Sequence, residues 1–507
     1  MSLVLSLDFG TGGIRAGVYD LAAARMISVA ERPYATSHPR PGWAEQDPEE
    51  WWTAMKAAAA EAVAATGKRG IAGISVATTA STVVACRRDG SPLRPAILWM
   101  DCRAAAQSAR TGQVRHPVLA YSGEGDAVEW LVPKAMWLAE HERETYAASE
   151  VLCEAVDFIN FRLTGRWAGS RLNATCKWNY DPLQRRFSPE LFEAFGVPDL
   201  LDKLPSDIVP VGEALAALKP ELAAELGIAG APVVAQGGID AHIGVFGAGT
   251  VAPGRMLMIG GTSVVHLIHS DRQRDLPGIW GPYPDALVDG LWLIEGGQVS
   301  AGSILSWLSD RIFGLDQRGF EALLAQAAEV PVGSSGLVTL DYWMGNRTPY
   351  RDPDLRGAIL GLSLWHDRAT IYRSAVEAVA LGSANVVADL VAKGVPVDHL
   401  VIAGGICKNP LWLQATVEAI GMPVHVARQD NLSLIGSAVA AATAIGAFPD
   451  LQTASDYCAA PAELVVPDGA AHSRYAEMLV LYREATRQVG EISHQLARRA
   501  EQGRSHS

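Results

Sequence analysis

The chain has 507 residues, of which 49% are hydrophobic and 19% charged, and its formal net charge is −13 at pH 7. This length exceeds one ordinary hydrophobic core and predicts roughly two to four domains, and the apolar content excludes a largely disordered chain. The acidic balance argues against general binding to nucleic acid or to anionic membranes, because phosphates are held mainly by Lys and Arg.

The N-terminal stretch and the cysteines indicate a cytoplasmic protein. LVLSL is apolar, but no basic segment precedes it and Asp8 follows at once, so we expect no signal peptide. No uninterrupted apolar run is long enough to span a bilayer. The six cysteines form no CxxC pair, which favours free thiols. His266 and His269 lack a third partner for a metal, which favours core or surface histidines.

The first predicted elements are two strands joined by a glycine turn in SLDFGTGGIRAGVYD, residues 6–20. Apolar residues alternate up to Leu7, the pattern breaks at 10–13 and a second strand follows, so the segment matches neither a Walker loop nor a Rossmann turn. Consecutive amides of such a turn can bind an anion, and the Thr11 hydroxyl could extend that site. The alternative is an ordinary hairpin turn.

Two charged side chains flank this turn. Asp8 ends a buried strand, which is costly unless the carboxylate is hydrogen-bonded or faces a cation. A Mg²⁺ ion carried by nucleotide phosphates would satisfy it. Arg15, on the outgoing strand, either adds positive charge to the same site or is a surface charge on an edge strand.

Strands and helices alternate in the following residues. DPEEWW predicts a helix start, with Asp47 as N-cap, Pro48 at the first position and Glu50 placed for a capping box. IAGISVATTASTVVACRRDG (71–90) predicts two strands around a centre rich in Thr and Ser, and VLCEAVDFINFRLTG (151–165) predicts a helix. This alternation indicates an α/β domain whose strand ends face a cleft.

A second carboxylate follows a glycine pair in VVAQGGIDAHIGVFGAG, residues 233–249. Asp240 comes directly after an apolar strand that ends near Gly237 and Gly238. Such an aspartate can accept the proton of a substrate hydroxyl that attacks a phosphoryl group. It can equally be the N-cap of a helix that begins at Ala241.

The second half repeats the first hairpin. After a glycine-rich crossover, FGAGTVAPGR (246–255), the segment RMLMIGGTSVVHLIHS (255–270) predicts strand, turn and strand, with the Thr262 and Ser263 hydroxyls in the turn. Similar hairpins near the head of each half suggest two similarly built domains that face each other across a cleft. Two facing turns would suit a polyphosphate.

Three further elements are predicted near the C-terminus. LVIAGGICKNP (400–410) reads as a strand and a glycine turn, and NLSLIGSAVAAATAIG (431–446) as a helix. The small residues from Gly436 onward would let this helix approach another backbone or a nucleotide closely. An amphipathic helix follows Ser473.

Taken in order, these segments resemble the FGGY family of carbohydrate kinases, within the actin, hexokinase and Hsp70 superfamily. The resemblance covers nearly the whole chain and implies an α/β fold of two ribonuclease-H-like domains, 1–247 and 248–507, closing on a sugar and on ATP with Mg²⁺. The matching motifs are LDFGTGGIRAGVYD, PGWAEQDPEEWW, WLVPKAMWLAEHE, GGIDAHIG, IGGTSVV, GGQVSAGSILSW, GNRTPYRDPDLRG and AGGICKNPLWLQ.

The resemblance also implies roles for individual residues. Asp240 would be the catalytic base, and Asp8 and Asp240 would face the metal. Lys134 and Trp137, although part of a family signature, would stabilise packing. The implied nucleotide contacts are Gly10, Thr11, Gly12, Gly13, Arg15, Gly260, Gly261, Thr262, Ser263, Gly302, Gly404, Gly405, Asn409 and Gly436.

Substrate choice is read from fewer residues. Xylulose kinases commonly carry Gln-Met-His-Gly and glycerol kinases Gln-Arg-Glu-Thr where this chain has ATTA, Ala77 to Ala80. ATTASTVV, ILWMDCRA, VEWLVPKAMW and NATCKWNYDP look more like the ribulokinase branch, particularly the D-ribulose kinases. The implied sugar contacts are Thr78, Thr79, Glu129, Asp240, Lys177 and His242.

Several alternatives stay open at this point. Lys177 and Trp178 could instead lie in a packed surface loop. The substrate could be xylulose, ribitol, erythritol or glycerol, and the chain could be a nucleotide switch related to actin or Hsp70. The expected partners are a small sugar or polyol and ATP, with no nucleic acid and no membrane, and a homodimer is allowed.

Overall fold

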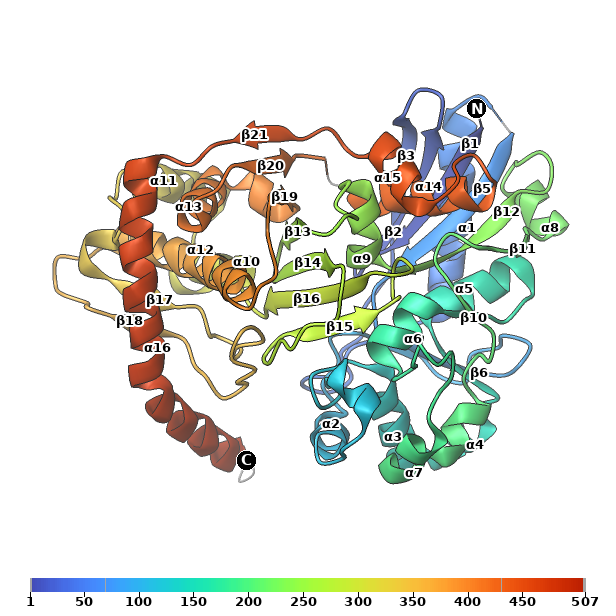
Figure 1. Ribbon diagram of the computed structural model, residues 1–507, viewed down its shortest axis with the longest axis horizontal. Coiled ribbons are helices and arrows are strands. Elements are labelled where there is room, and N and C mark those ends of the chain that lie inside the picture. The colour runs from blue at the N-terminus through green and yellow to red at the C-terminus, as the bar shows by residue number, and fades with distance from the viewer. Residues whose placement is uncertain (1, 69, 430, 505–507) are drawn as a thin grey trace.

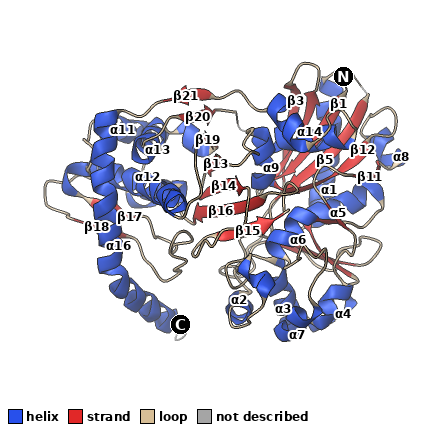
Figure 2. Cartoon of the chain, viewed as in Figure 1, coloured by secondary structure: helices blue, strands red, loops and turns tan. Residues whose placement is uncertain are grey.

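The computed structural model describes residues 2–68, 70–429 and 431–504, which form two α/β lobes side by side (Figure 1). The first lobe contains a six-stranded sheet and the second a seven-stranded sheet. Helices lie around both sheets (Figure 2). The predicted architecture of two α/β domains is confirmed, and the domain boundary at 247/248 stays a prediction.

In the sheet of the first lobe, the parallel strands β1, β5 and β12 place their carboxyl ends at the same edge. β1 pairs antiparallel with β2 and parallel with β5, and β5 pairs parallel with β12. Every residue of β1 is buried, as its apolar sequence predicts. In sheet order the strands are β11 (Ala214–Ala217), β12 (Val233–Ile239), β5 (Ile71–Thr78), β1 (Leu3–Phe9), β2 (Gly13–Asp20) and β3 (Arg25–Pro33).

Two small sheets complete the first lobe. One has the strand order β4 (Glu45–Gln46), β7 (Ala96–Ile97), β6 (Val83–Cys86) and β8 (Val151–Glu154). The other pairs β10 (Ile208–Val209) with β9 (Gly169–Ser170).

The sheet of the second lobe contains the predicted second hairpin, in which β13 and β14 pair antiparallel. A further pair joins β17 (Val338–Leu340) to β18 (Ala358–Leu360). In sheet order the main strands are β15 (Trp280–Pro284), β16 (Trp292–Gln298), β14 (Val264–Ser270), β13 (Arg255–Gly260), β19 (His399–Ala403), β20 (Val424–Ala427) and β21 (Glu463–Val465).

The helices pack on these sheets and enclose the cores of the two lobes. In the first half they are α1 (Pro48–Ala65), α2 (Ala105–Thr111), α3 (Leu131–His141), α4 (Arg143–Ala148), α5 (Ala155–Thr164), α6 (Arg171–Lys177), α7 (Pro189–Phe195), α8 (Pro220–Glu225) and α9 (Asp240–Gly247). In the second half they are α10 (Gly302–Ser306), α11 (Gln317–Ala328), α12 (Arg368–Ala392), α13 (Pro410–Ile420), α14 (Leu432–Ala444), α15 (Leu451–Cys458) and α16 (Gly469–Arg504).

Two local predictions need correction. Asp47 does cap α1, since its side chain accepts a hydrogen bond from the Glu49 amide, but Glu50 does not complete a capping box and accepts from the Ala35 amide. VLCEAVDFINFRLTG is not all helix, because its first four residues form β8 and the helix α5 begins at Ala155. These four residues are buried and pair antiparallel with β6.

Helix α14 belongs to the second half of the sequence but packs on the first sheet, against β1, β5 and β12, and on α9 (Figure 1). Gly436 permits this contact, because a Cβ there would lie 2.0 Å from the carbonyl oxygen of Ile243 in α9. Gly436 lines neither of the two cavities described below, and its place near the nucleotide stays a prediction. The close approach of α14 to another backbone, the alternative, is what the structure shows.

Burial bears on three further sequence expectations, which concern the histidines, the cysteines and the apolar helices. His266 and His269 are core residues, and burial lowers the pKa of His266 to about 3 and that of His269 to about 4. In the described part of the chain, the cysteines are free and no group of three or more potential ligands could hold a metal ion. By length and composition α12 could cross a membrane, but 78% of its apolar window is buried inside the protein, as in a core helix.

Candidate active site

Asp8 and Asp240 lie at the same edge of the first sheet. Asp8 is near the end of β1, and Asp240 follows β12 directly, with β5 between these two parallel strands. Both carboxylates line one cavity of about 340 Å³, here called the catalytic cavity. Its other lining residues are Gly10, Arg15, Ala241, Gly244, Ile259, Ala403, Gly404, Lys408, Gln429, Leu432 and Ser433.

One oxygen of the buried Asp8 carboxylate is held from two sides. Arg15 donates to Oδ2 through Nε at 3.2 Å and also through Nη2, and the Ser433 hydroxyl donates to Oδ2 at 2.7 Å. The Oδ1 atom is buried and has no hydrogen-bond partner among the described residues. A buried carboxylate oxygen left without a donor is a suitable ligand for a hard cation such as Mg²⁺.

Asp240 is the first residue of α9 rather than its N-cap, which is Ile239. Its Oδ1 accepts a hydrogen bond from the Ala241 amide at 2.7 Å. Burial and the negative charge of Asp8 raise the pKa of Asp240 to about 7. A carboxylate with this pKa can take up a proton near neutral pH, as a general base must.

A larger cavity of about 840 Å³ lies beside the turn of the second hairpin. Gly261, Thr262, Gly302, Gly405 and Asn409, all predicted nucleotide contacts, line it. Three aromatic side chains that also line it could stack on a base: Trp307, Phe320 and Tyr372.

The start of α10 is tied to the turn of the second hairpin. The Ala301 and Ser303 amides donate to the Thr262 carbonyl, and the Gly302 amide donates to the Gly261 carbonyl at 3.0 Å. A Cβ on Gly302 would lie 2.5 Å from that carbonyl oxygen, so only glycine fits this approach. Because α10 begins against the turn of the second hairpin, Gly302 lines the larger cavity although it lies about 40 residues after that turn in the sequence.

The remaining predicted nucleotide contacts line neither cavity. Thr11 instead accepts a hydrogen bond at Oγ1 from the Trp99 indole at 3.0 Å. A Cβ on Gly13 would lie 2.6 Å from the Arg32 carbonyl oxygen, and one on Gly260 would lie 2.9 Å from Ile406. These glycines therefore serve close packing in the hairpins, while Gly12 and Ser263 lie in the turns themselves.

The two threonines predicted to contact the sugar are bonded within their own turn. Thr78 ends β5 and donates from Oγ1 to the Thr79 carbonyl at 3.2 Å. The Thr79 and Thr82 hydroxyls are 2.8 Å apart. These contacts place both threonines at the end of β5, between the strands that lead to Asp8 and Asp240.

The structure brings Lys177 and His242 together on a residue that the sequence did not single out. Glu295, on β16, accepts from Lys177 Nζ at 3.1 Å, and His242 Nε2 lies 3.4 Å from the same oxygen. Burial alone would raise the pKa of Glu295, but Lys177 and His242 outweigh it and hold that pKa far below its usual range. A glutamate as the one charged residue of the buried strand WLIEGGQ is the signal that could have revealed it.

The alternative of a packed surface loop for Lys177 and Trp178 is wrong. Lys177 ends helix α6 and is buried, with Nζ 4.9 Å from the ring centroid of Trp130. Trp178 lies in the core, where its indole donates to Glu154 at 2.8 Å. Only Lys177 therefore belongs to the group of charges around Glu295.

Glu129, the last predicted sugar contact, bridges the two lobes. Its Oε1 accepts from Arg347 Nη2 at 3.0 Å. The Arg347 guanidinium also lies over Trp280, 4.4 Å from the ring centroid. Glu129 and the Lys177–Glu295 pair thus each join a residue of the first half to one of the second.

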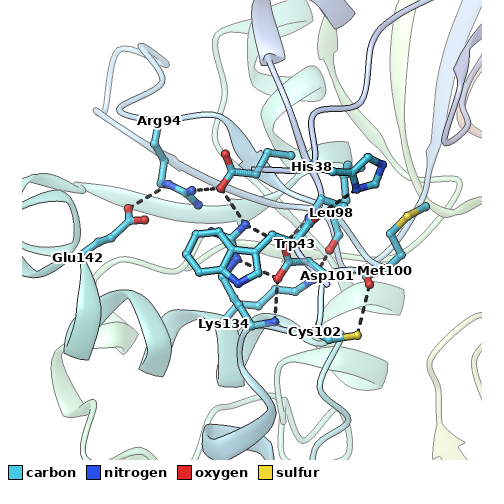
Figure 3. Close-up of polar contacts among 12 residues, drawn as sticks. His38, Trp43, Arg94, Leu98, Met100, Asp101, Cys102, Lys134 and Glu142 are labelled. Carbon is cyan, nitrogen blue, oxygen red and sulfur yellow. Dashed lines mark hydrogen bonds and ion pairs between the residues drawn. The ribbon is translucent and has the colours of Figure 1, made fainter. Parts of the chain in front are cut away.

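A polar network supports the loop that carries Trp99 (Figure 3). Asp101 accepts from the Ala44 amide at 2.6 Å and from Arg103 Nε at 2.8 Å. Arg103 in turn lies over Trp43, 3.8 Å from the ring centroid. Because Trp99 binds Thr11, this network connects the first lobe's interior to the turn of the first hairpin.

Lys134 and Trp137 are structural, as predicted. Lys134 is fully buried and donates to the carbonyl oxygens of Ser81 and Leu98, each at 2.7 Å (Figure 3). Burial lowers the pKa of Lys134 to about 8. Trp137 packs edge-on against Trp43, with ring centroids 5.2 Å apart.

Comparison with known proteins agrees with this geometry. Residues 3–247 match the N-terminal domain of the FGGY family of carbohydrate kinases, and residues 256–445 match its C-terminal domain. A ribulokinase from Mycolicibacterium smegmatis is 33% identical over 89% of this chain and 87% of its own. An FGGY carbohydrate kinase domain-containing protein from Homo sapiens is 30% identical over 91% of this chain and 92% of its own.

Solved structures show the same fold. A xylulose kinase from Rhodospirillum rubrum, 28% identical, superposes with a TM-score of 0.85 over 97% of this chain and 100% of its own. The match to carbohydrate kinases sets aside a nucleotide switch without sugar chemistry. The chain therefore belongs to the FGGY family of carbohydrate kinases, and it is a sugar kinase that uses ATP as phosphoryl donor.

Proposed function

We propose that this enzyme transfers the γ-phosphoryl group of Mg²⁺-bound ATP to a hydroxyl of a pentulose, and that D-ribulose is its best substrate. The observation that carries the proposal is the position of Asp240, with its pKa raised to about 7, beside Asp8 in the catalytic cavity. The larger cavity supplies space for the nucleotide, and the predicted phosphate-binding turn of the second hairpin contributes Gly261 and Thr262 to its lining.

In this mechanism Asp240 takes the proton of the attacking sugar hydroxyl. The hydroxyl oxygen forms a bond to the γ-phosphorus, the bond from that phosphorus to the bridging β-phosphate oxygen breaks, and this oxygen leaves with the electron pair as part of ADP. Asp8 would hold Mg²⁺ through its unpartnered Oδ1, and the metal when bound would neutralise phosphate charge. Arg15 and Ser433 fix the orientation of Asp8 through its other oxygen.

The substrate class rests on the residues beyond Asp240. Ala77 to Ala80 lack the Met-His and Arg-Glu pairs typical of xylulose and glycerol kinases. His242, two residues after Asp240 on α9, joins Lys177 and Glu295 in a buried group of donors and acceptors, which suits a polyol because a buried hydroxyl left unpaired is costly. The ribulokinase relative supports a pentulose, and xylulose is the main rival because the structural neighbour is named a xylulose kinase.

A coupled ADP-release assay over pentuloses, pentitols, erythritol and glycerol tests the proposal. We expect the highest kcat/KM with D-ribulose and little ATP hydrolysis without sugar. A higher kcat/KM for another acceptor would replace D-ribulose with that acceptor. A cytoplasmic location and a homodimer stay predictions, which cell fractionation and sedimentation would test.

A further inference from the structure

A third cavity, of about 720 Å³, lies where the two lobes meet and is here called the junction cavity. Among the described residues, it shares no lining residue with the catalytic cavity or the larger cavity. The first lobe contributes the end of the 3-10 helix η1 (Pro117–Ala120) and the turn that follows it. The second lobe contributes residues 273–278 between β14 and β15, the start of β15, and Arg351.

The two lobes are hydrogen-bonded to each other in the wall of this cavity. The Gly281 amide, on β15, donates to the Tyr121 carbonyl at 2.9 Å, and Arg351 Nη1 donates to the Gly123 carbonyl. Gly123 has a φ of +71°, and a Cβ there would overlap Nη1 of Arg351, so only glycine admits the guanidinium. A ligand in the junction cavity would therefore touch both lobes at a point where they are already joined.

Two arginines line the interior of the junction cavity. The side chain of Arg274 is only 15% exposed, and its Nε donates to the Ser270 hydroxyl at 3.0 Å. Its ion-pair partner, Asp271, is 3.9 Å away and 69% exposed, which makes a weak pair. Arg351 is half-buried, and within the described parts of the chain it forms no ion pair with a carboxylate.

The carboxylates of the same lining lie on the solvent side. The Glu124 side chain is 77% exposed and pairs with Arg115 at 3.6 Å, and Asp275 is exposed. Burial lowers the pKa of Arg351, and the nearby Tyr283 and Glu124 offset this only in part. A guanidinium removed from water without a close carboxylate favours an anionic ligand, because the anion replaces the lost solvation.

Strand β15 connects the junction cavity to the charged group around Glu295. Gly281 and Pro282 form part of the cavity wall, and Trp280 precedes them on the same strand. The Trp280 ring lies between two cations of that group, with Lys177 Nζ at 5.0 Å and the Arg347 guanidinium at 4.4 Å from its centroid. Contacts that steady β15 against the first lobe would therefore also steady this group.

We propose that the junction cavity is a second ligand site, in which Arg274 and Arg351 bind the phosphate group of a small phosphorylated metabolite that holds the two lobes together. Guanidinium groups bind phosphate oxygens through short, charge-assisted hydrogen bonds. The cavity volume lies within the usual range for small-molecule sites, about 300–1,000 Å³, and leaves room for the organic part of the ligand. Anion binding is independent of the proposed function, and only the link to the sugar rests on it.

Calorimetric titrations with 2-phosphoglycolate, inorganic phosphate and glycolate test the binding. The β,γ-imido analogue of ATP, saturating and with Mg²⁺, first fills the nucleotide site so that phosphate cannot bind there. We expect phosphoglycolate to bind the wild type, inorganic phosphate to compete with it, and glycolate to bind far more weakly. Loss of one charge-assisted contact in Arg274→Met should weaken phosphoglycolate by about 10-fold or more.

Neighbouring and conservative variants serve as controls. Arg272→Met removes a 70% exposed cation two residues away that does not line the cavity, and it should bind phosphoglycolate as the wild type does. Arg274→Lys should keep part of the affinity, and Arg351→Met should lose it. If Arg351→Met does not fold, the comparison of Arg274→Met with Arg272→Met still decides the question.

Three binding results would overturn the site: no binding of phosphoglycolate to the wild type up to about 10 mM, equal losses in Arg272→Met and Arg274→Met, or no loss in Arg274→Met. Glycolate that binds as tightly as phosphoglycolate would overturn the assignment to phosphate. Because no sugar is present in these titrations, their failure is distinct from failure of the pentulose proposal, which the ADP-release assay detects.

The ADP-release assay tests the link between the lobes. Two ligands that favour the same arrangement of the lobes raise each other's affinity, so saturating phosphoglycolate should lower the KM for the best sugar by about fivefold or more. In Arg274→Met, kcat and KM without phosphoglycolate should equal those of the wild type, and phosphoglycolate should not change them. A wild-type KM that stays the same or rises would overturn the claim that the ligand holds the lobes together.

Discussion

The two glycine hairpins share a backbone plan but present different side chains to the catalytic cavity. In the second cross-strand pair from the turn, β1 and β2 carry Asp8 opposite Arg15, whereas β13 and β14 carry Ile259 opposite Val265. Asp8 and Ile259 both line the catalytic cavity. The repeated fold thus supplies two turns, but the charged chemistry depends on residue identity at one register position of the first.

The second hairpin makes a different contribution. The carbonyls of its turn accept hydrogen bonds from the start of α10, and Gly261 and Thr262 line the larger cavity. We therefore infer a division of labour, in which the first hairpin orients the acid that faces the metal and the second shapes the nucleotide site. The predictions below test that division.

The largest effect is expected from Asp240→Asn. Loss of a general base should lower kcat by about 10²- to 10⁴-fold, while the Kd for ADP stays the same because the nucleotide occupies the larger cavity. Coupled ADP release and calorimetry measure the two quantities. Asp271→Asn, which removes an exposed carboxylate, is the control and should be neutral. Near-normal turnover of Asp240→Asn would eliminate the base assignment.

Asp8→Asn should act on the metal. Losing the carboxylate removes the unpartnered Oδ1 as an anionic ligand, and we expect the Mg²⁺ concentration for half-maximal activity to rise by about 10- to 100-fold. A Mg²⁺ titration of the initial rate measures it. Asp20→Asn, at the far end of the same hairpin, should leave the Mg²⁺ dependence unchanged. If the Mg²⁺ dependence of Asp8→Asn were the same as that of the wild type, the first hairpin would not supply the metal ligand.

Paired glycine substitutions separate the two turns. In Gly302→Ala the new Cβ would meet the Gly261 carbonyl oxygen at 2.5 Å, so we expect roughly tenfold weaker ADP binding from overpacking. In Gly12→Ala the Cβ would meet nothing within 4 Å, and ADP binding should be retained. If Gly12→Ala weakened ADP binding as much as Gly302→Ala, the nucleotide would depend equally on both hairpins.

The last predicted effect concerns stability and not activity. Because folding raises the pKa of Asp240 to about 7, the folded state binds its proton more tightly than the unfolded state between about pH 4 and 7, and the ionised carboxylate destabilises the fold at higher pH. Asp240→Asn should therefore be more stable than the wild type at pH 8, by up to about 4 kcal/mol, because each unit of pKa shift corresponds to about 1.4 kcal/mol. The advantage should shrink as pH falls through 7 and vanish below about 4.

Urea denaturation without ligands, at pH 8 and pH 5, measures this difference. A variant that is less stable than the wild type at pH 8 would show that Asp240 is stabilised in its ionised form. The pKa of Asp240 would then lie below its ordinary value, whereas burial and the charge of Asp8 should raise it.

Local sequence patterns predicted much of the fold. The alternation in residues 3–20 and the glycines at 10–13 determine a hairpin by themselves, and Asp47 with Pro48 determines the start of α1. The start of β8 was misread because VLCE is apolar and continuous with the following helix, and only pairing with β6 makes it a strand. Such pairing joins residues far apart in the chain and leaves no local signal.

The site was predicted less completely for the same reason. Ser433 donates to Asp8 although 425 positions separate them, and Glu295 meets Lys177 across 118 positions. The small residues from Gly436 onward left open whether the helix approaches a ligand or another backbone, and only the structure shows Gly436 against α9. Asp8 and Asp240 were found because each is a carboxylate beside glycines at the end of an apolar strand.

The pH dependence of kcat/KM for MgATP tests most directly the claim that Asp8 and Asp240 act as a coupled pair, because this parameter reports the enzyme before nucleotide and metal bind. With sugar saturating, the wild type should lose activity as pH falls below about 7, where Asp240 takes up a proton. In Asp8→Asn the negative neighbour is gone, so the same decline should move to lower pH. A decline at the same pH in both enzymes, or none in the wild type, would contradict the account.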